Sequence, residues 1–278
     1  MVIAVASGKG GTGKTTISVS LAIAAAPVVL VDADVEEPNA NILLRAEHSS
    51  VKRASLPFPI VDVVKCDFCE KCSEFCAYNA IVVLKGLKVF AVPEICKSCG
   101  GCALVCPQDA IREKPRDIGY IKFGERLNVK LIEGELKIGE TQATPLIRML
   151  WKNIPNDLDV IIDSPPGAAH PMVEAVRNSD FVLLVTEPTP FGLHDLREAM
   201  VVVKSLGKKA GLLINRADVG TDEIRRFASE NNLPILMEIP FDEQIARHYS
   251  MGWAPAEFSA QWREEFRKLW VRMKEHIQ

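Results

Sequence analysis

A glycine-rich segment at residues 2–16, VIAVASGKGGTGKTT, constrains the fold of this chain more than any other feature. It opens with five largely apolar residues, which are typical of a buried parallel strand, and leads directly into a turn. Gly8, Gly10, Gly11 and Gly13 let the backbone turn tightly and direct its N–H groups inward, and the N-terminus of the following helix favours negative charge. The segment therefore predicts a strand, a phosphate-binding loop and a helix, in that order.

Two side chains after these glycines separate two nucleotide-binding interpretations. The glycines also spell G-x-G-x-x-G, and Asp32 follows the apolar run 28–31 at the distance that a dinucleotide-binding fold requires. An NAD site does not need the pair Lys14 and Thr15, whereas a triphosphate site uses such a lysine on the outer phosphates and such a hydroxyl on Mg²⁺. A second apolar strand that ends at Asp163 and is followed by Ser-Pro-Pro-Gly also favours the triphosphate site.

The second lysine of the loop, Lys9, gives the motif a family resemblance. KGGTGKTT resembles the deviant Walker A motif of the MinD/ParA family of P-loop ATPases, whose relatives include the Mrp-type iron-sulfur carriers and the nitrogenase iron protein. In that family the extra lysine crosses to the partner subunit's nucleotide in an ATP-bound dimer. The resemblance implies ATP or ADP as ligand, a homodimer in the ATP state, catalytic roles for Lys9 and Lys14, and nucleotide contacts from Thr12, Thr15 and Thr16. The alternative for Lys9 is a lysine that only solvates the loop.

The same resemblance implies roles for acids that follow two later strands. Asp34 would orient or activate the water that attacks the γ-phosphate, and Asp32 would support the Mg²⁺ shell that Thr15 joins. Asp163 would hold Mg²⁺ from the Walker B position, and Gly167 would offer its N–H to the γ-phosphate. The alternative for Asp32 and Asp34 is a pair of acids in a solvated loop.

Three further residues are assigned to the adenine end of the nucleotide by resemblance. Asn215, which ends the apolar run 211–214, would contact the adenine edge together with Arg216, and Pro240 would flank the base. The alternative for Asn215 is an ordinary turn asparagine. His170 departs from relatives that commonly carry a cysteine shortly after the Pro-Pro-Gly turn; it is either a helix-start residue or a switch-linked group.

All eight cysteines lie within one short segment and form an internal repeat. The pattern C-x2-C-x2-C-x3-C begins at Cys66 and begins again at Cys96, so its period is thirty residues. Cysteines gathered in this way indicate a metal site in a reducing compartment rather than the disulfides of a secreted fold.

The spacing is that of bacterial-type ferredoxins, in which three cysteines of one half are completed by the fourth cysteine of the other half. It predicts two [4Fe-4S] clusters, one held by Cys66, Cys69, Cys72 and Cys106, and the other by Cys96, Cys99, Cys102 and Cys76. The pattern expects a proline after the last cysteine of each half, and only Cys106 has one. Two four-cysteine zinc sites remain the alternative.

These features predict a discontinuous nucleotide domain interrupted by a second domain. The alternation of strands and helices indicates an α/β, doubly wound, mostly parallel-sheet P-loop NTPase over residues 1–56 and 120–278, with an inserted small α+β ferredoxin-like domain at 57–119. We expect strands near 28–31, 160–163, 181–185, 211–214 and 235–239, a strand with a hairpin over 131–139, helices near 41–44, 145–152 and 222–231, a helix ending near 206, and only a polar stretch at 47–53.

The last segment predicts an amphipathic helix. Apolar residues recur at steps of four and three opposite charged residues, at Phe258, Trp262, Phe266, Leu269, Met273 and Ile277. Because MinD proteins end in a helix that reaches the membrane, membrane contact is an alternative, but the aromatic stripe and mixed charges favour a helix docked on its own core. The absence of an apolar run of 18 residues and of a basic leader predicts a cytoplasmic protein, and a net charge of −3 gives no reason to expect nucleic-acid binding.

Three functions are compatible with these features. The first is an MgATPase, slow and partner-stimulated, that couples its nucleotide state to electron transfer through two clusters to a protein redox partner. The second is an Mrp-type iron-sulfur carrier or assembly ATPase, which is disfavoured because such carriers use a separate CxxC and no cysteine follows Cys106. The third is a MinD-like spatial-organisation ATPase whose final helix finds a membrane.

Overall fold

The computed structural model describes residues 1–277, which divide into two compact units. One unit, here called the sheet unit, comprises residues 1–52, 121–135 and the chain from 143 onward. The other, the cysteine unit, comprises 53–120 and Leu136–Gln142. The predicted nucleotide domain includes residues 136–142. The structure corrects this, because these residues bond to strand and loop residues of the cysteine unit.

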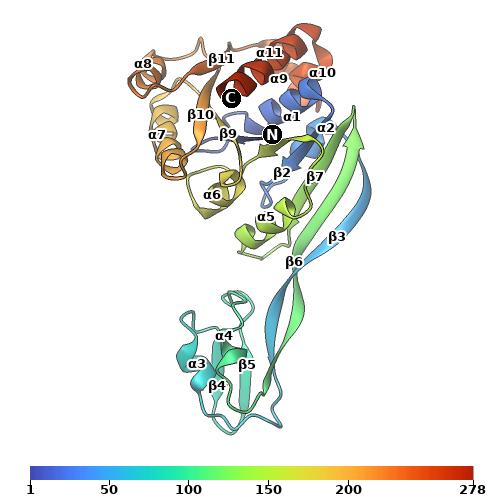
Figure 1. Cartoon of the computed structure of the whole chain (residues 1–278), viewed down its shortest axis with the longest axis vertical. Helices are drawn as coiled ribbons and strands as arrows, with labels where there is room; N and C mark the ends of the chain where they lie inside the picture. The colour runs from blue at the N-terminus through green and yellow to red at the C-terminus, as the bar shows by residue number, and fades with distance from the viewer. Residues whose placement is uncertain (278) are drawn as a thin grey trace. The chain divides into compact units, whose positions relative to one another are not determined.

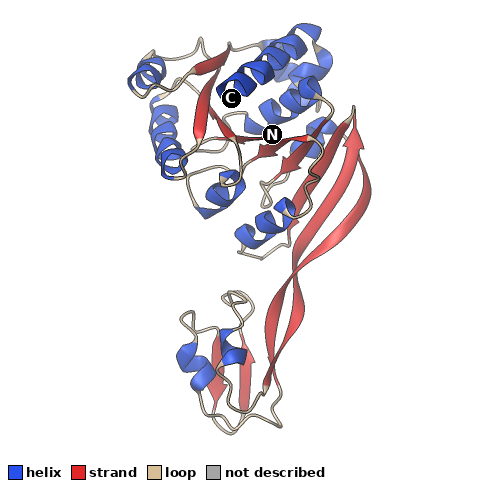
Figure 2. Cartoon of the chain, viewed as in Figure 1, coloured by secondary structure: helices blue, strands red, loops and turns tan. Residues whose placement is uncertain are grey.

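The sheet unit is an α/β structure built on a mostly parallel sheet, which confirms the predicted fold class (Figure 2). The strand order is β11-β10-β9-β1-β8-β2-β7-β6-β3, and each pairing from β11 to β7 is parallel. The central strands are continuous apolar runs because helices cover both of their faces. The strands are β1 (Val2–Ala6), β2 (Val28–Asp32), β3 (Glu47–Val61), β6 (Ile111–Arg126), β7 (Val129–Leu136), β8 (Asp159–Asp163), β9 (Phe181–Thr186), β10 (Lys209–Asn215) and β11 (Ile235–Ile239).

The helices are distributed over both faces of this sheet (Figure 1). Helices α1, α2, α10 and α11 share one apolar core, whereas α6 packs on β1 and α7 on β9. The connection from β1 through α1 leads to β2, and the connection from β8 through α6 leads to β9, which lies in the opposite direction along the sheet. Because such crossovers are right-handed, the two helices cover opposite faces of the sheet. The helices are α1 (Lys14–Ala25), α2 (Ala40–Leu44), α5 (Ala143–Trp151), α6 (His170–Val176), α7 (Pro190–Ser205), α8 (Glu223–Glu230), α9 (Glu243–Ser250), α10 (Pro255–Phe258) and α11 (Ala260–Ile277).

Two long strands were not predicted from the sequence. The polar stretch at 47–53 forms the start of β3, and β6 continues well beyond the cysteines until a two-residue turn connects it to β7. Leu127 and Asn128 in that turn both have positive φ, as the turns of tight hairpins require. The prediction of no element at 47–53 was wrong because β3 gains its hydrogen-bonding partner from β6, which is distant in sequence.

Helix α11 docks on the core of the sheet unit. Phe266, Leu269 and Met273 are fully buried, and the helix packs against α1. Phe258 belongs to the short helix α10 instead, so the predicted amphipathic helix begins two residues later than expected. Within the described residues, every helix is too short or too polar to cross a membrane.

The cysteine unit repeats its conformation at the period of its sequence. It contains α3 (Lys71–Phe75), α4 (Gly101–Leu104) and an antiparallel pair formed by β4 (Ile81–Leu84) and β5 (Lys88–Ala91). Positive φ angles recur thirty residues apart, at Phe68 and Ser98, Glu70 and Gly100, and Asn79 and Asp109. The two halves therefore have the same local fold, and they enclose a small core of Ile81, Val89 and Ile111.

Candidate functional site

The glycine-rich loop connects β1 to α1 at the carboxyl end of the parallel strands, where ligands of open α/β sheets bind. Gly13 precedes α1 with φ 91°, a conformation that favours glycine. At Gly8 the reason for glycine is space, because a Cβ there would lie 2.0 Å from the backbone oxygen of Asp195 on α7. The loop geometry therefore depends both on backbone conformation and on the close approach of another helix.

A cavity of about 370 Å³ opens beside this loop. It brings together many of the residues that the sequence assigned to a nucleotide, namely Gly10, Gly11, Gly13, Lys14, Thr15, Thr16, Asp34, Asn215, Arg216 and Pro240. Gly8, Lys9, Thr12, Asp32, Asp163 and Gly167 do not line it. The cavity has the size of a small-molecule site, and it extends from the loop to an apolar end that includes Phe241 and Tyr249.

Asp163 lies at the end of β8, beneath the loop, and is completely buried. Its Oδ1 accepts a hydrogen bond from the Ser18 hydroxyl at 2.9 Å, whereas its Oδ2 has no partner among the described residues. Burial raises the pKa of this carboxyl, and the nearby Thr15 hydroxyl and the charge of Lys14 oppose the shift. A buried, unpaired carboxylate oxygen next to a threonine hydroxyl fits the oxygen donors that Mg²⁺ prefers.

Asp32 is directly opposite Asp163 on the neighbouring strand, but its oxygens are differently engaged. It accepts backbone N–H bonds from Asp34 at 3.1 Å, Asn39 at 3.0 Å and Ala40 at 2.9 Å. Burial and the nearby Asp163 charge raise its pKa well above the ordinary value. In this structure Asp32 therefore holds the loop that carries Asp34; its predicted contribution to a Mg²⁺ shell stays a prediction.

Lys14 and Asp34 both line the cavity, and their charges act on each other. Burial lowers the pKa of the Lys14 ammonium, and the charges of Asp163 and Asp34 oppose that shift. Burial raises the pKa of Asp34 to about 6, with a further contribution from Asp163 and an opposing one from Lys14. A carboxyl with this pKa can accept a proton near neutral pH, which suits a group that activates water.

The adenine-end residues lie together but are already bonded to the backbone. The Asn215 amide donates to the Thr12 carbonyl at 3.0 Å, and its oxygen accepts from the Arg216 N–H at 3.0 Å. Arg216 also pairs with the largely buried Glu187 at 3.0 Å. Asn215 thus connects the end of β10 to the glycine-rich loop in this structure, and its predicted adenine contact stays a prediction.

Sequence reasoning missed two buried polar residues at this site. Ser18 is four residues after Lys14, so it lies on the face of α1 that meets Asp163. Glu133 on β7 is the register partner of Asp32 and pairs with Lys122 at 3.3 Å. The signal available for Glu133 was an acid directly after the apolar pair Leu131 and Ile132 in a predicted strand, and a helical spacing of four was the signal for Ser18.

The structure brings the four cysteines of the first predicted group together, while the ligand assignment itself stays a prediction. Cys66, Cys69, Cys72 and Cys106 line one small cavity, with Pro107 and apolar side chains around them. Burial raises the pKa of the Cys72 thiol, and the neighbouring Cys106 and Cys66 add to the shift. This places the last cysteine of the second half among the first three cysteines of the first half.

Three cysteines of the second predicted group, Cys96, Cys99 and Cys102, also lie near one another, whereas the place of Cys76 in this group stays a prediction. Burial raises the pKa of the Cys102 thiol to about 11, and the nearby Cys96 and Cys99 add to the shift. The sulfurs of Cys76 and Cys106 each accept a backbone N–H bond of 3.3 Å from the residue four positions later. All eight cysteines are free, so thiol donors are available in both groups. N–H bonds to cysteine sulfur are among the features that tune iron-sulfur clusters, so these donors fit such groups.

Thiol spacing bears on the zinc alternative. Four sulfurs bound tetrahedrally to one zinc at ~2.3 Å lie ~3.8 Å apart. Over residues 1–277, no three cysteine sulfurs lie within 4.8 Å of one another. The two iron-sulfur clusters and the two zinc sites therefore both stay predictions.

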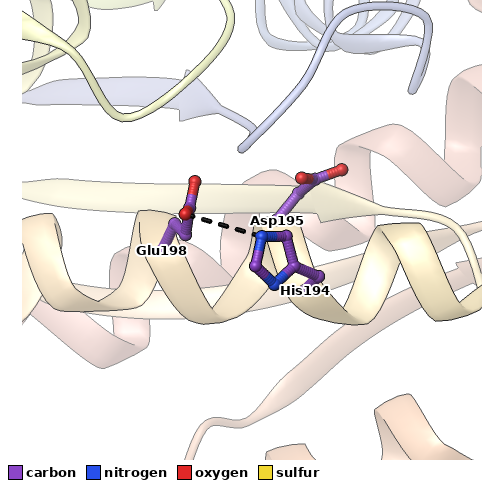
Figure 3. A group of neighbouring side chains, drawn as sticks. All are labelled: His194, Asp195 and Glu198. Carbon is purple, nitrogen blue, oxygen red and sulfur yellow. Dashed lines mark ion pairs between the residues drawn. The ribbon is translucent and has the colours of Figure 1, made fainter.

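Within residues 1–277, one group of potential metal-binding side chains has its ligand atoms within 4.8 Å of one another. It consists of His194, Asp195 and Glu198 on α7. Figure 3 shows the ion pair between His194 and Glu198 as a dashed line. The His194 Nε2 and Glu198 Oε1 atoms lie 3.5 Å apart. Both side chains are more than half exposed, and such surface pairs are common without an ion. We assign no metal to this group.

A sequence model described as the CobQ/CobB/MinD/ParA nucleotide binding domain matches residues 3–253. The chain belongs to this family. The family relationship predicted from Lys9 and Lys14 is confirmed at this level, and the triphosphate-loop interpretation is favoured over the dinucleotide one.

Individual members of the CobQ/CobB/MinD/ParA family are similar along most of the chain. An uncharacterized protein of Methanocaldococcus jannaschii, MJ0578, is 30% identical over 287 aligned positions that cover 100% of this chain and 98% of its own. The septum site-determining protein MinD of Thermotoga maritima is 28% identical over 88% of this chain and 76% of its own. The structure of MinD complexed with Mg-ADP from Pyrococcus horikoshii superposes with a TM-score of 0.58 at 20% identity, covering 96% of this chain and 93% of the other, which shows a shared fold.

Three further residues that the sequence singled out, Lys9, Gly167 and His170, lie outside the lining of the cavity. The carbonyl of Lys9 accepts a hydrogen bond from the Ser7 hydroxyl, and Lys9 itself is partly exposed. The Gly167 N–H donates to the Ser7 carbonyl at 3.1 Å, so a bond from it to a γ-phosphate requires this contact to open. His170 is exposed and is the first residue of α6, which agrees with its interpretation as a helix-start residue.

Proposed function

We propose that this protein binds and hydrolyses MgATP and uses its nucleotide state as a switch. The observation that carries the proposal is the meeting of Lys14, Asp34 and the unpaired Asp163 oxygen at a glycine-rich loop. The Mg-ADP bound by the Pyrococcus horikoshii MinD supports the same ligand here. Slow, partner-stimulated turnover is part of this proposal.

Each residue has a defined task in the proposed reaction. Lys14 and the loop N–H groups neutralise phosphate charge, and Thr15 with Asp163 would hold Mg²⁺, which supplies further charge neutralisation. Asp34 orients the attacking water and accepts its proton, so that the water oxygen bonds to the γ-phosphorus while the bond to the leaving ADP oxygen breaks. Because phosphoryl transfer needs mainly positioning and charge stabilisation, this set is sufficient.

Nucleotide binding to variants tests this proposal. We expect Lys14→Ala to abolish ATP binding or turnover, while Lys130→Ala, at an exposed lysine of the same unit, leaves both unchanged. Asp34→Ala should retain ATP binding and slow hydrolysis. Unchanged turnover in Lys14→Ala would refute the assignment.

We also propose an ATP-state homodimer to which Lys9 contributes across the interface. Its support is the family membership and the partial exposure of Lys9 beside the loop. Light scattering with a non-hydrolysable ATP analogue should show a dimer for the wild type and a monomer for Lys9→Ala. A dimer in both would remove the role of Lys9.

The comparisons favour a MinD-like switch over electron transfer as the use of this ATPase. The buried apolar face of α11, however, supports a helix docked on its own core rather than one that seeks a membrane. Liposome flotation with ATP distinguishes the two, since a docked helix predicts no flotation. We retain a cytoplasmic location without nucleic-acid binding as part of the proposal.

A specific observation favours a second candidate function, electron transfer to a protein partner. Two groups of free thiols, one around a shared cavity, support two [4Fe-4S] clusters with the crossed ligation predicted above. Iron and sulfide analysis and EPR of anaerobically purified protein test the clusters. Loss of iron to an apo-acceptor protein would instead favour the carrier or assembly alternative.

A further inference from the structure

The segment between β7 and α5 is bonded to the loop that carries one cysteine group. Gln142 is buried, and its side-chain amide donates to the Cys96 carbonyl at 2.9 Å. Cys96 is the one buried cysteine of the eight. Gln142 therefore holds the ligand loop of the group that contains Cys96, Cys99 and Cys102.

Glu140 fixes the conformation of this segment. Its Oε1 accepts the backbone N–H groups of Thr141 at 3.0 Å and Gln142 at 3.1 Å, and its other oxygen pairs with Arg116. The Glu140 side chain is only 4% exposed, although its bond to the Thr141 N–H lies at the surface. Because both carboxylate oxygens are bonded, Glu140 fixes the conformation of the segment.

The chain itself connects Gln142 to helices of the sheet unit. The residue after Gln142 begins α5, and α5 packs on α6. The Trp151 indole N–H of α5 donates to the Glu174 carbonyl of α6 at 3.1 Å, and Arg148 pairs with the buried Glu174 carboxylate at 3.0 Å. Helix α6 starts three residues after Gly167, whose N–H must leave the Ser7 carbonyl to reach a γ-phosphate.

We propose that Gln142 is a positioning residue that transmits a movement of α5 to the Cys96 loop, so that the nucleotide state alters the environment of the cluster bound there. This rests on the proposed function, because it requires both a nucleotide switch and clusters. In this proposal, the hydrogen bond from Gln142 to the Cys96 carbonyl carries the effect of the nucleotide site to the proposed cluster site. Removing its donor separates the two sites and leaves the ligands of each intact.

A matched control exists in the other half of the repeat. Gln108 donates its amide to Asp67 at 3.1 Å, close to the Cys66 and Cys106 group, and has no connection to α5. Gln142→Met and Gln108→Met thus each remove a glutamine amide donor beside one of the two groups, from a buried site at Gln142 and from an exposed site at Gln108. Gln142→Glu is a second variant that keeps the shape of the side chain but loses the donor.

The test uses the full chain, purified anaerobically, with Mg²⁺ and either ADP or a non-hydrolysable ATP analogue. EPR-monitored titration gives the reduction potential of each cluster, and amide hydrogen exchange gives the opening of residues 94–99. In the wild type we expect the analogue to shift the potential of one cluster. Gln142→Met and Gln142→Glu should lose this shift and exchange about fivefold faster at 94–99, the effect of one ordinary hydrogen bond, whereas Gln108→Met keeps the shift.

The outcomes separate this inference from the proposed function. A shift retained in both Gln142 variants, or lost equally in Gln108→Met, overturns the role of Gln142. A wild-type protein that binds iron and nucleotide but has nucleotide-independent potentials also overturns it, while leaving a cluster-bearing ATPase intact. A wild-type protein without iron overturns the cluster proposal itself.

Discussion

Replacing Ser18 by alanine should remove a hydrogen bond to the Asp163 carboxylate, on which the proposed nucleotide site depends. The Ser18 hydroxyl and Asp163 are both completely buried and are joined by a 2.9 Å bond. A hydrogen bond to a charged group contributes about 1.5–3 kcal/mol, and its loss leaves the Asp163 oxygen without that donor. We therefore expect Ser18→Ala to lower the free energy of unfolding by about 1.5–3 kcal/mol, or Tm by roughly 3–12 °C for a unit of this size.

Ser20 supplies a matched control on the same helix. It is as buried as Ser18, but its hydroxyl has no partner among the described residues. Ser20→Ala should therefore not lower the free energy of unfolding, because no hydrogen bond is lost and a buried hydroxyl without a partner is removed. Thermal unfolding of nucleotide-free protein measures both variants, and equal losses in the two would refute the reasoning. Ser18→Ala should also weaken Mg²⁺-dependent nucleotide binding, whereas Ser20→Ala should not.

Three further predictions follow from burial, space and charge. The pKa of Asp34 is raised to about 6, so the folded state binds this proton more tightly than the unfolded state, and the free energy of unfolding falls as the pH rises from about 4 to 6. Asp34→Asn should remove this fall and raise the free energy of unfolding by about 1–2 kcal/mol at pH 7. Urea unfolding at several pH values measures this difference. Gly8→Ala should cost about 1–3 kcal/mol because of the Asp195 backbone, while Gly10→Ala, where a Cβ meets open space, should be close to neutral in the same assay. Phe266→Ala should cost about 3–5 kcal/mol and the exposed Val271→Ala less than about 0.5; a small loss at Phe266 would argue against a docked α11.

The parts of this molecule that are local in sequence were predicted well. The glycine-rich loop, the apolar strands and the helices between them follow from motif and periodicity, because their residues act on near neighbours. The positions that were missed depend on distant partners. The polar start of β3 becomes a strand only beside β6, and Ser18 matters only because β8 brings Asp163 beneath it.

The segment 136–142 shows the same limit most clearly. Its sequence suggests a hairpin next to the nucleotide domain, but Glu140 and Gln142 bond to Arg116 and Cys96, which are 24 and 46 residues away. No local pattern carries that information. In the cysteine repeat, by contrast, the spacing of thirty residues was visible at once, and the backbone repeats with the same period.

The most direct test of the account measures metal and nucleotide on one anaerobic sample of the full chain. The account predicts about eight iron atoms per chain, as two four-iron clusters require, together with bound ATP or ADP that Lys14→Ala loses while keeping its iron. A colourless protein that carries zinc in place of iron, and whose nucleotide content is the same in the Lys14 variant, would contradict it.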